Sequence, residues 1–137
     1  MNIPAFFEQA RSHIYQQEFS KLKALSLDKP TYFNWVEEIF YDLNVKSFGE
    51  ARALIWRYYE QEKVYSFQTI YEAANQLLNL LRSHKVKQGD HIYSLLPLVP
   101  ANWISFLATI KGGFVMMPTA TNLTSRDLIY RFESLFP

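Results

Sequence analysis

The chain has 137 residues, a length that suits one domain or a part of one. Its 14 basic and 13 acidic residues nearly balance, which argues against nucleic acid or another polyanion as a partner. Because cysteine is absent, disulfides, cysteine nucleophiles and thiolate metal sites are excluded, and a reducing, cytoplasmic location is expected. No run of about 18 apolar residues occurs, so we expect no helix that spans a membrane.

The first third of the chain is predicted to be helical. Residues 4–25 repeat apolar side chains at helical spacing, and Pro4 suits the first position of a helix. A second helix is expected to start at Asn34, which forms a capping pair with Glu37. Glu37 and the adjacent Glu38 point in different directions on a helix, so we interpret them as a solvated face and not as an acid/base pair.

Residues 50–65 are compatible with two local structures. Their good helix formers favour a helix. The apolar and aromatic run over 53–59 instead favours a strand, with Val64 and Tyr65 as its hairpin partner across residues 60–63. The hairpin is the favoured interpretation.

A long helix is expected from Ser66, which caps it, to about His84. Five apolar residues recur on one of its faces at helical spacing: Ile70, Ala73, Ala74, Leu77 and Leu81. This face is predicted to be buried.

The last third is predicted to form a strand, a helix, a second strand and a second helix. The strands cover 91–97 and 114–118, and the helix between them begins at Pro100 and ends at the Gly112–Gly113 pair. The residues expected on the buried face of that helix are Trp103, Phe106, Leu107 and Ile110. A strand–helix–strand unit of this kind is typical of a parallel, doubly wound sheet.

A loop over residues 119–123 connects the second strand to the last helix, which Thr124 and Asp127 open with a capping box. The side chains expected to face inward from that helix are Leu128, Phe132 and Leu135. In open α/β sheets ligands gather at the carboxyl ends of strands, and the small polar residues of this loop allow a close approach. A plain strand-to-helix connector is the alternative.

No constellation of catalytic or metal-binding residues is found in the sequence. The chain's glycines are Gly49, Gly89, Gly112 and Gly113, and they form neither a dinucleotide fingerprint nor a Walker phosphate loop. The histidines are His13, His84 and His91, and none has a second ligand at the spacing of a known metal motif. Asp90, next to Gly89, is interpreted as a turn residue. We therefore predict no catalytic residue and no metal ligand in this chain.

Four segments carry a resemblance to a known family: FNWVEEIF (33–40), YSF (65–67) with the helix after it, VKQGDHIYSLLPLVPANW (86–103) and IKGGFVMMPTATNLTSRDLIYRF (110–132). In this order and spacing, they make residues 33–135 similar to the N-terminal part of acyl-CoA synthetases of the adenylate-forming superfamily, above all the medium-chain type. The resemblance implies an α/β fold, the N-terminal part of a doubly wound, partly parallel sheet with flanking helices. Residues 1–32 are then an N-terminal helical leader, and residues 33–137 are the first part of the family's large domain.

The resemblance also implies the activity of a whole enzyme. A carboxylic acid attacks ATP to give an acyl-adenylate and pyrophosphate, Mg²⁺ neutralises phosphate charge, and the thiol of CoA then displaces AMP. The family's phosphate loop, adenine-binding segment, ribose aspartate and C-terminal lysine have no counterpart here. The segment alone is therefore expected to be inactive and to bind none of these cofactors. Asn122 matches a family position near CoA and is the one candidate for a CoA contact.

Two other interpretations stay open. The chain could belong to an adenylation domain of another adenylate-forming enzyme, or it could be a non-catalytic interaction module. An unfinished sheet leaves strand edges unpaired, so we expect this chain to self-associate, and its oligomeric state bears on the interaction-module interpretation.

Overall fold

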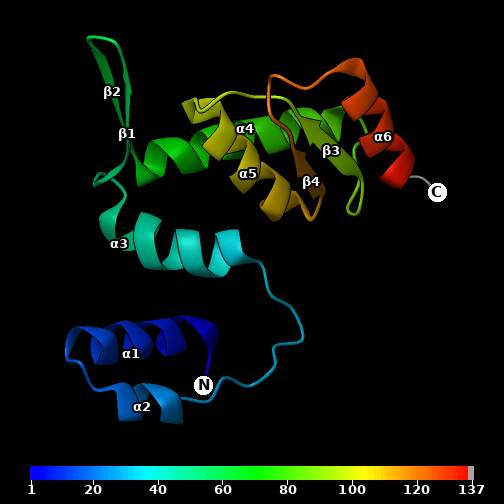
Figure 1. The fold of residues 1–137 in the computed structure, drawn as a ribbon. Coiled ribbons are helices and arrows are strands. Elements are labelled where there is room, and N and C mark those ends of the chain that lie inside the picture. The colour runs from blue at the N-terminus through cyan, green and yellow to red at the C-terminus, as the bar shows by residue number, and fades with distance from the viewer. Residues whose placement is uncertain (136–137) are drawn as a thin grey trace. The chain divides into compact units, whose positions relative to one another are not determined.

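A computed structural model describes residues 1–135 of the chain, without the side chain of Leu135. The backbone divides into two compact units, Met1–Ala73 and a second unit that begins at Ala74. The first unit combines helices with an antiparallel hairpin, and the second carries a parallel pair of strands (Figure 1). The α/β class predicted from the sequence is confirmed. None of the helices within residues 1–135 has both the length and the apolarity needed to cross a bilayer.

Two helices form the N-terminus, α1 (Ile3–Tyr15) and α2 (Phe19–Ala24). The side chain of Asn2 caps α1 by accepting a hydrogen bond from an amide of the first turn at 2.9 Å. The predicted single helix over 4–25 is wrong. The chain turns at Gln17, whose φ of 57° is left-handed and cannot continue a right-handed helix.

A π-helix, η1 (Val36–Val45), follows, and a short α-helix, α3 (Lys46–Phe48), continues it. Asn34 caps η1 as predicted, because its side-chain oxygen accepts hydrogen bonds from two amides of the first turn at 3.1 and 3.4 Å. The predicted solvated acidic face is wrong for Glu37. This residue is half-buried, and its carboxylate accepts a hydrogen bond from the Tyr71 hydroxyl at 3.2 Å. The buried core shared by α1 and η1 consists of Ile3, Ile39 and Leu43.

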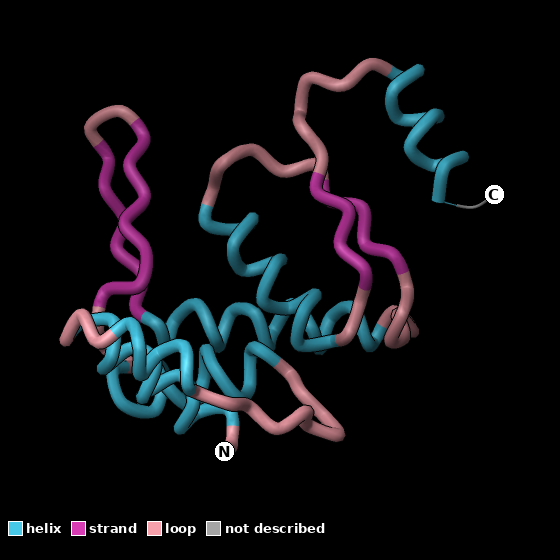
Figure 2. The backbone as a smooth tube through the Cα atoms, turned by 60° about the horizontal axis from the view of Figure 1, so that its bottom comes forward, coloured by secondary structure: helices cyan, strands magenta, loops and turns pink. Residues whose placement is uncertain are grey.

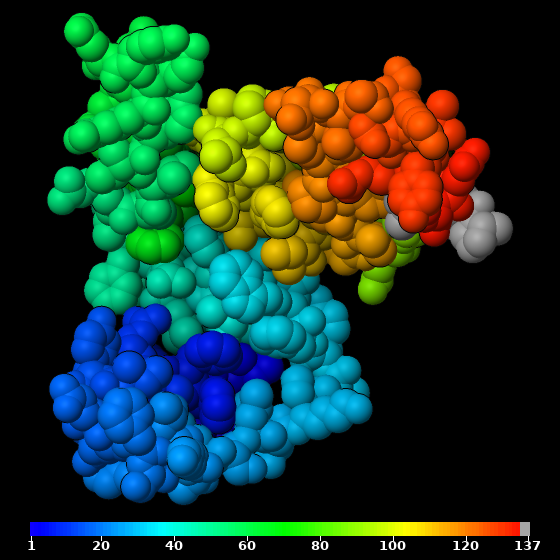
Figure 3. Space-filling model, in the orientation of Figure 1, coloured from blue at the N-terminus to red at the C-terminus, as the bar shows by residue number. Residues whose placement is uncertain are grey.

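The strands β1 (Arg52–Tyr58) and β2 (Gln61–Ser66) form an antiparallel hairpin, which confirms the favoured interpretation. The turn is shorter than expected, because only two residues separate the strands and the first of them, Tyr59, takes a left-handed φ of 52°. The rings of Trp56 and Tyr58 stack with their centroids 5.8 Å apart. The hairpin, green in the space-filling view of Figure 3, exposes much of its surface, with Tyr59 88% exposed.

The helix α4 (Phe67–Ser83) starts at the predicted cap, since the Ser66 hydroxyl accepts a hydrogen bond from an amide of its first turn at 3.1 Å. The predicted buried stripe is right for Ile70 and Ala74 but omits Leu78, which is only 2% exposed. The buried positions therefore recur every fourth residue, as on one face of an α-helix.

In the second unit, β3 (His91–Ser94) and β4 (Val115–Pro118) pair in parallel, and α5 (Pro100–Gly112) connects them. Figure 2 shows the two strands side by side in magenta. The first strand is shorter than the predicted 91–97. Gly113 ends α5 as predicted, in the left-handed conformation with a φ of 68°, which glycine adopts without steric cost.

The buried face of α5 differs in part from the prediction. Leu107 is buried as expected, but Trp103 and Ile110 are 52% and 40% exposed, and Ala108 and Thr109 are buried instead. The parallel sheet beside α5 has two described strands, β3 and β4. A sheet this narrow covers only one side of the helix. The predicted inward positions of Trp103 and Ile110 are therefore wrong.

The last helix, α6 (Ser125–Leu135), begins at the predicted capping box. The Thr124 hydroxyl donates to the Asp127 carboxylate at 2.6 Å, and the Asp127 amide donates back to the same hydroxyl at 3.3 Å. The hydrogen bonds from the side chain and the amide of Thr124 hold the pKa of Asp127 below its ordinary value. This helix start is thus fixed by local interactions.

The predicted inward face of α6 is confirmed only in part. Leu128 is half-buried, whereas Phe132 is 44% exposed, although its ring centroid lies 4.8 Å from that of Tyr93. The predicted inward position of the Leu135 side chain lies outside the described residues.

Candidate functional site

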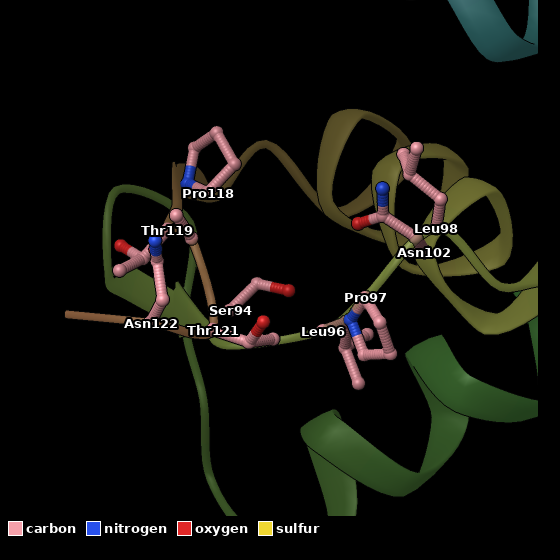
Figure 4. Close-up of a pocket in the computed structure, with 10 residues that line it drawn as sticks. Ser94, Leu96, Pro97, Leu98, Asn102, Pro118, Thr119, Thr121 and Asn122 are labelled. Carbon is pink, nitrogen blue, oxygen red and sulfur yellow. The ribbon is translucent and has the colours of Figure 1, made fainter.

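The carboxyl ends of β3 and β4 lie together, because Ser94 is opposite Pro118 in the parallel register. A hollow of about 530 Å³ opens at this edge (Figure 4). Its lining comes from the ends of both strands, the first turn of α5 and the segments that follow the strands: Ser94, Leu96, Pro97, Leu98, Asn102, Pro118, Thr119, Ala120, Thr121 and Asn122. Ligands of open α/β sheets gather at this edge, so the hollow is the candidate site.

The loop after β4 is anchored to the neighbouring strand. The Thr119 amide donates to the Ser94 carbonyl oxygen at 2.9 Å, and the Thr119 hydroxyl donates to the Met117 carbonyl oxygen at 3.5 Å. Thr119 is 7% exposed, whereas the three residues after it are exposed. The loop therefore starts from a fixed residue and presents the next three beside the hollow.

Four polar side chains around the hollow have no hydrogen-bond partner among the described residues: Ser94, Asn102, Thr121 and Asn122. Ser94 is only 7% exposed, and its hydroxyl oxygen is enclosed. In Figure 4 this hydroxyl points into the space between the loop of Asn122 and the helical turn of Asn102. A buried hydroxyl without a partner costs about 1–3 kcal/mol.

The lining of the hollow carries no ionisable side chain. It offers no cation for a phosphate group and no carboxylate for a metal ion. Elsewhere within residues 1–135, no three His, Cys, Asp or Glu residues lie close enough together to hold a metal. The site is therefore suited to uncharged groups that form hydrogen bonds.

The structure brings the predicted loop to this site but adds residues from other elements. Asn122 lies in the loop after β4 and lines the hollow. Ser94 and Asn102 are not among the residues predicted from the sequence. One signal pointed to Ser94, a small polar residue directly before the apolar segment Leu95–Pro97. Asn102 becomes significant only once α5 is placed beside the strand ends.

Other residues considered in the sequence lie outside the hollow. The Asp90 carboxylate accepts a hydrogen bond from the Lys87 amide at 2.7 Å, which confirms its role in a turn. His13, in the last turn of α1, has its ring Nδ1 2.9 Å from the carboxylate of Glu18, which lies in the turn before α2. His84 is exposed just after α4.

A family model described as "AMP-binding enzyme" matches residues 41–135. The chain belongs to the AMP-binding enzyme family. The matched residues include the hairpin, α4, both parallel strands and the whole lining of the hollow. The hollow is thus part of the family's own fold.

Two curated relatives that are similar in sequence to this chain are named as a CoA ligase and an acyl-coenzyme A synthetase. The 4-hydroxybutyrate--CoA ligase 1 of Metallosphaera sedula is 45% identical over 107 residues, which are 77% of this chain and 19% of the relative. The mitochondrial acyl-coenzyme A synthetase ACSM3 of Homo sapiens is 27% identical over 128 residues, 86% of this chain and 22% of the relative. The chain spans about a fifth of the length of these relatives.

Solved structures share the fold. The acetoacetyl-CoA synthetase from Streptomyces lividans superposes with a TM-score of 0.69 at 22% identity, over 77% of this chain and 16% of that one. The fatty acid AMP ligase from Legionella pneumophila gives a TM-score of 0.65 at 16% identity, over 81% of this chain and 19% of that one. With the family match, these similarities confirm the resemblance to the N-terminal part of an acyl-CoA synthetase.

Proposed function

We propose that this chain is the N-terminal part of an ATP-dependent ligase that joins a carboxylic acid to CoA through an acyl-adenylate. The observation that carries the proposal is the 45% identity over 107 residues to a protein named as a 4-hydroxybutyrate--CoA ligase. A second relative, ACSM3 of Homo sapiens, is named as an acyl-coenzyme A synthetase and supports the same class of reaction. ATP, CoA and Mg²⁺ are accordingly the expected cofactors, and a carboxylic acid is the expected substrate.

The residues of this chain favour a binding role and not a place in the chemical step. The four glycines form no phosphate-binding loop, and the lining of the hollow offers neither a cation for ATP phosphates nor a carboxylate for Mg²⁺. The hollow therefore does not fit Mg²⁺-ATP. We expect the 137-residue chain alone to form no acyl-adenylate.

The contact of this chain with CoA is proposed for Asn122. Its side-chain amide is exposed at the hollow and has no partner among residues 1–135. Such an amide offers donors and an acceptor in one plane, which suits the amides and ring nitrogens of CoA. The proposal gives Asn122 a role in binding and none in proton transfer.

Two assays on the complete reading frame test this function. The coding sequence is first followed beyond the Pro137 codon, because this chain spans 19% of its ligase relative. ATP–pyrophosphate exchange and thioester formation with CoA are then measured with a panel of carboxylic acids. We expect both activities with at least one acid, and neither with the 137-residue chain alone.

The alternatives give different results in the same assays. Exchange without any thioester would favour an adenylation domain that loads another acceptor. Absence of both activities with every acid would overturn the proposed ligase and leave the non-catalytic interaction module.

Two further expectations belong to this proposal. A cytoplasmic location remains a prediction, and cell fractionation would measure it. The relative ACSM3 is named mitochondrial, so a mitochondrial location is the other outcome of that measurement. Self-association through unpaired strand edges also remains a prediction.

A further inference from the structure

We propose that the outer edge of β3, the edge that faces away from β4, binds a parallel strand from the segment that follows α6 in the complete protein. β3 is then an inner strand of the sheet, and β4 lies at its rim. The inference rests on the proposed function, because it takes this chain to be the N-terminal part of a longer ligase. Among residues 1–135, β4 is the strand that pairs with β3, and the outer edge of β3 has no partner strand.

The helices α5 and α6 lie on opposite faces of the strand pair. The Ser94 side chain lines a hollow with Asn102 of α5, whereas Tyr93, the residue before it, lines another hollow with Tyr130 of α6. Successive side chains of a strand point to opposite faces. The ring centroid of Tyr93 also lies 4.8 Å from that of Phe132 in α6. Figure 2 accordingly shows the two strands between the two helices.

The faces that the helices occupy determine the direction in which the chain continues. Crossovers between parallel strands share one hand, the right, in about 98% of cases. Two crossovers of the same hand on opposite faces of a sheet run across it in opposite directions. Because α5 leads the chain from β3 to β4 on one face, α6 leads it back across β3 on the other. The first open place in that direction is the outer edge of β3.

The outer edge of β4 is poorly suited to another strand. On its inner edge, the Val115 amide donates to the Asp90 carbonyl oxygen at 2.9 Å. The Thr119 amide donates to the Ser94 carbonyl oxygen at the same distance. Alternate residues of a strand direct their backbone groups to opposite edges, so Pro118 faces the outer edge, where it supplies no N–H. Proline is typical of edge strands and opposes further pairing.

The outer edge of β3 carries no such block. By the same alternation, the N–H and C=O of Tyr93 point to this edge, since the carbonyl oxygen of the next residue is bonded to β4. No strand among residues 1–135 pairs with these two groups. Backbone groups that become covered need hydrogen-bond partners, and a neighbouring strand supplies them. Of the two strands, β3 is therefore the one suited to an inner position.

The expected partner strand is short and apolar. Connections from a helix to a strand commonly take about two to six residues, so this strand should begin within about ten residues of the end of α6. A strand covered on both faces reads as a continuous apolar run of about four to eight residues. Parallel pairing places the start of the run beside His91, the first residue of β3.

Disulfide crosslinking in the complete enzyme tests the edge, the orientation and the occupant together. His91 and Val115 are opposite each other in the register and both are exposed, so cysteines at these positions are matched probes of the two strands. Each is combined with single cysteines along the apolar run after α6, in an enzyme whose other cysteines have been replaced. Neighbouring strands lie about 4.8 Å apart, within reach of a disulfide, whereas the strand beyond lies about 10 Å away, out of reach.

We expect His91→Cys, and not Val115→Cys, to crosslink, and to do so with cysteines in the first half of the run. Crosslinks through Val115→Cys, with or without those through His91→Cys, would overturn the inference, and so would the absence of any crosslink. Crosslinks from His91→Cys to the second half of the run alone would indicate an antiparallel strand and would also overturn it.

Hydrogen exchange of the unmodified enzyme gives a readout without added thiols. The amides of Tyr93 and Met116 both point to outer edges, by the alternation described above. We expect the Tyr93 amide to exchange at least about tenfold more slowly than the Met116 amide, because the new strand bonds to the first of them only. A Met116 amide that exchanges as slowly as that of Tyr93, or more slowly, would contradict the placement.

The inference and the proposed function can fail separately. A complete enzyme that makes acyl-CoA and crosslinks through Val115→Cys would overturn the inference alone. A complete protein that crosslinks through His91→Cys and makes no acyl-CoA would overturn the proposed reaction alone.

Discussion

At the scale of single residues, Gly112 leaves no room for a side chain at the end of α5. A Cβ at this position would lie 2.6 Å from the ring of Phe114 and 2.8 Å from Leu78 Cδ1. Gly112→Ala therefore forces two buried side chains to move, and the expected loss in the free energy of unfolding is about 1–3 kcal/mol. Urea unfolding followed by circular dichroism measures this loss.

A double-mutant cycle identifies the cause of that loss. If crowding against the ring is responsible, Gly112→Ala should cost less in a Phe114→Leu background, where the ring has been removed. An equal loss in both backgrounds would contradict the steric explanation.

Asn122 gives the residue-scale prediction for function. In the complete enzyme, Asn122→Ala should raise the KM for CoA about three- to tenfold and leave kcat unchanged, because one hydrogen bond is lost from the ground and transition states alike. Initial rates over a range of CoA concentrations measure both constants, with Asn79→Ala as the matched control. Unchanged CoA kinetics would remove Asn122 from the binding site.

At the scale of elements, the start of α6 depends on an ionised Asp127. Hydrogen bonds from Thr124 lower the pKa of Asp127 in the folded chain relative to the unfolded chain. The ionised carboxylate therefore stabilises α6 above the unfolded value of about 4, and this contribution is lost as the pH falls through the lower, folded pKa.

An NMR titration checks this pH dependence. The amide signals of the first turn of α6 should move as the pH falls below about 4, and Asp127→Asn should abolish the movement. An Asp127 carboxyl that titrates at or above its ordinary value would contradict the capping role.

The elements that could be predicted from the sequence are those whose causes are local. The Ser66 cap, the Thr124–Asp127 box and the end of α5 at Gly113 follow from the chemistry of a few neighbouring residues. The break at Gln17 has no such signal, since glutamine rarely takes a left-handed φ. The exposure of Trp103 depends on what covers α5, which helical periodicity cannot specify.

The same distinction applies to the candidate site. The loop over residues 119–123 was predictable as a candidate site because it directly follows a strand, and carboxyl strand ends are where ligands gather. Asn122 itself was singled out by the resemblance to the family, and its contact with CoA stays a prediction. Ser94 and Asn102 required the register of β3 with β4 and the position of α5, which depend on contacts between segments far apart in the sequence.

At the scale of the whole molecule, strand edges govern the expected association. Each of the two described sheets has two strands, so each has edges with no partner strand among residues 1–135. Such edges pair readily with other chains. We expect dimers or larger species at micromolar concentration, and light scattering measures them. A stable monomer would contradict this expectation.

A pair of matched variants locates the association. Ile55 in β1 is 46% exposed, and Leu80 on α4 is 55% exposed. Ile55→Lys places a charge on a strand of the hairpin and should lower the associated fraction, because lysine on an edge strand opposes pairing. Leu80→Lys removes a similar apolar surface from a helix and should have little effect. Equal effects of the two variants would favour general hydrophobic association.

The two parallel strands are neighbours in space, but α5 lies between them along the chain. During synthesis, at about 5–20 residues per second, β3 leaves the ribosome on the order of seconds before β4. Throughout that interval its backbone groups have no partner in β4, and their pairing must wait until β4 has been made. A slower passage of the ribosome through α5 therefore lengthens the time for which this edge of β3 is unpaired in the nascent chain.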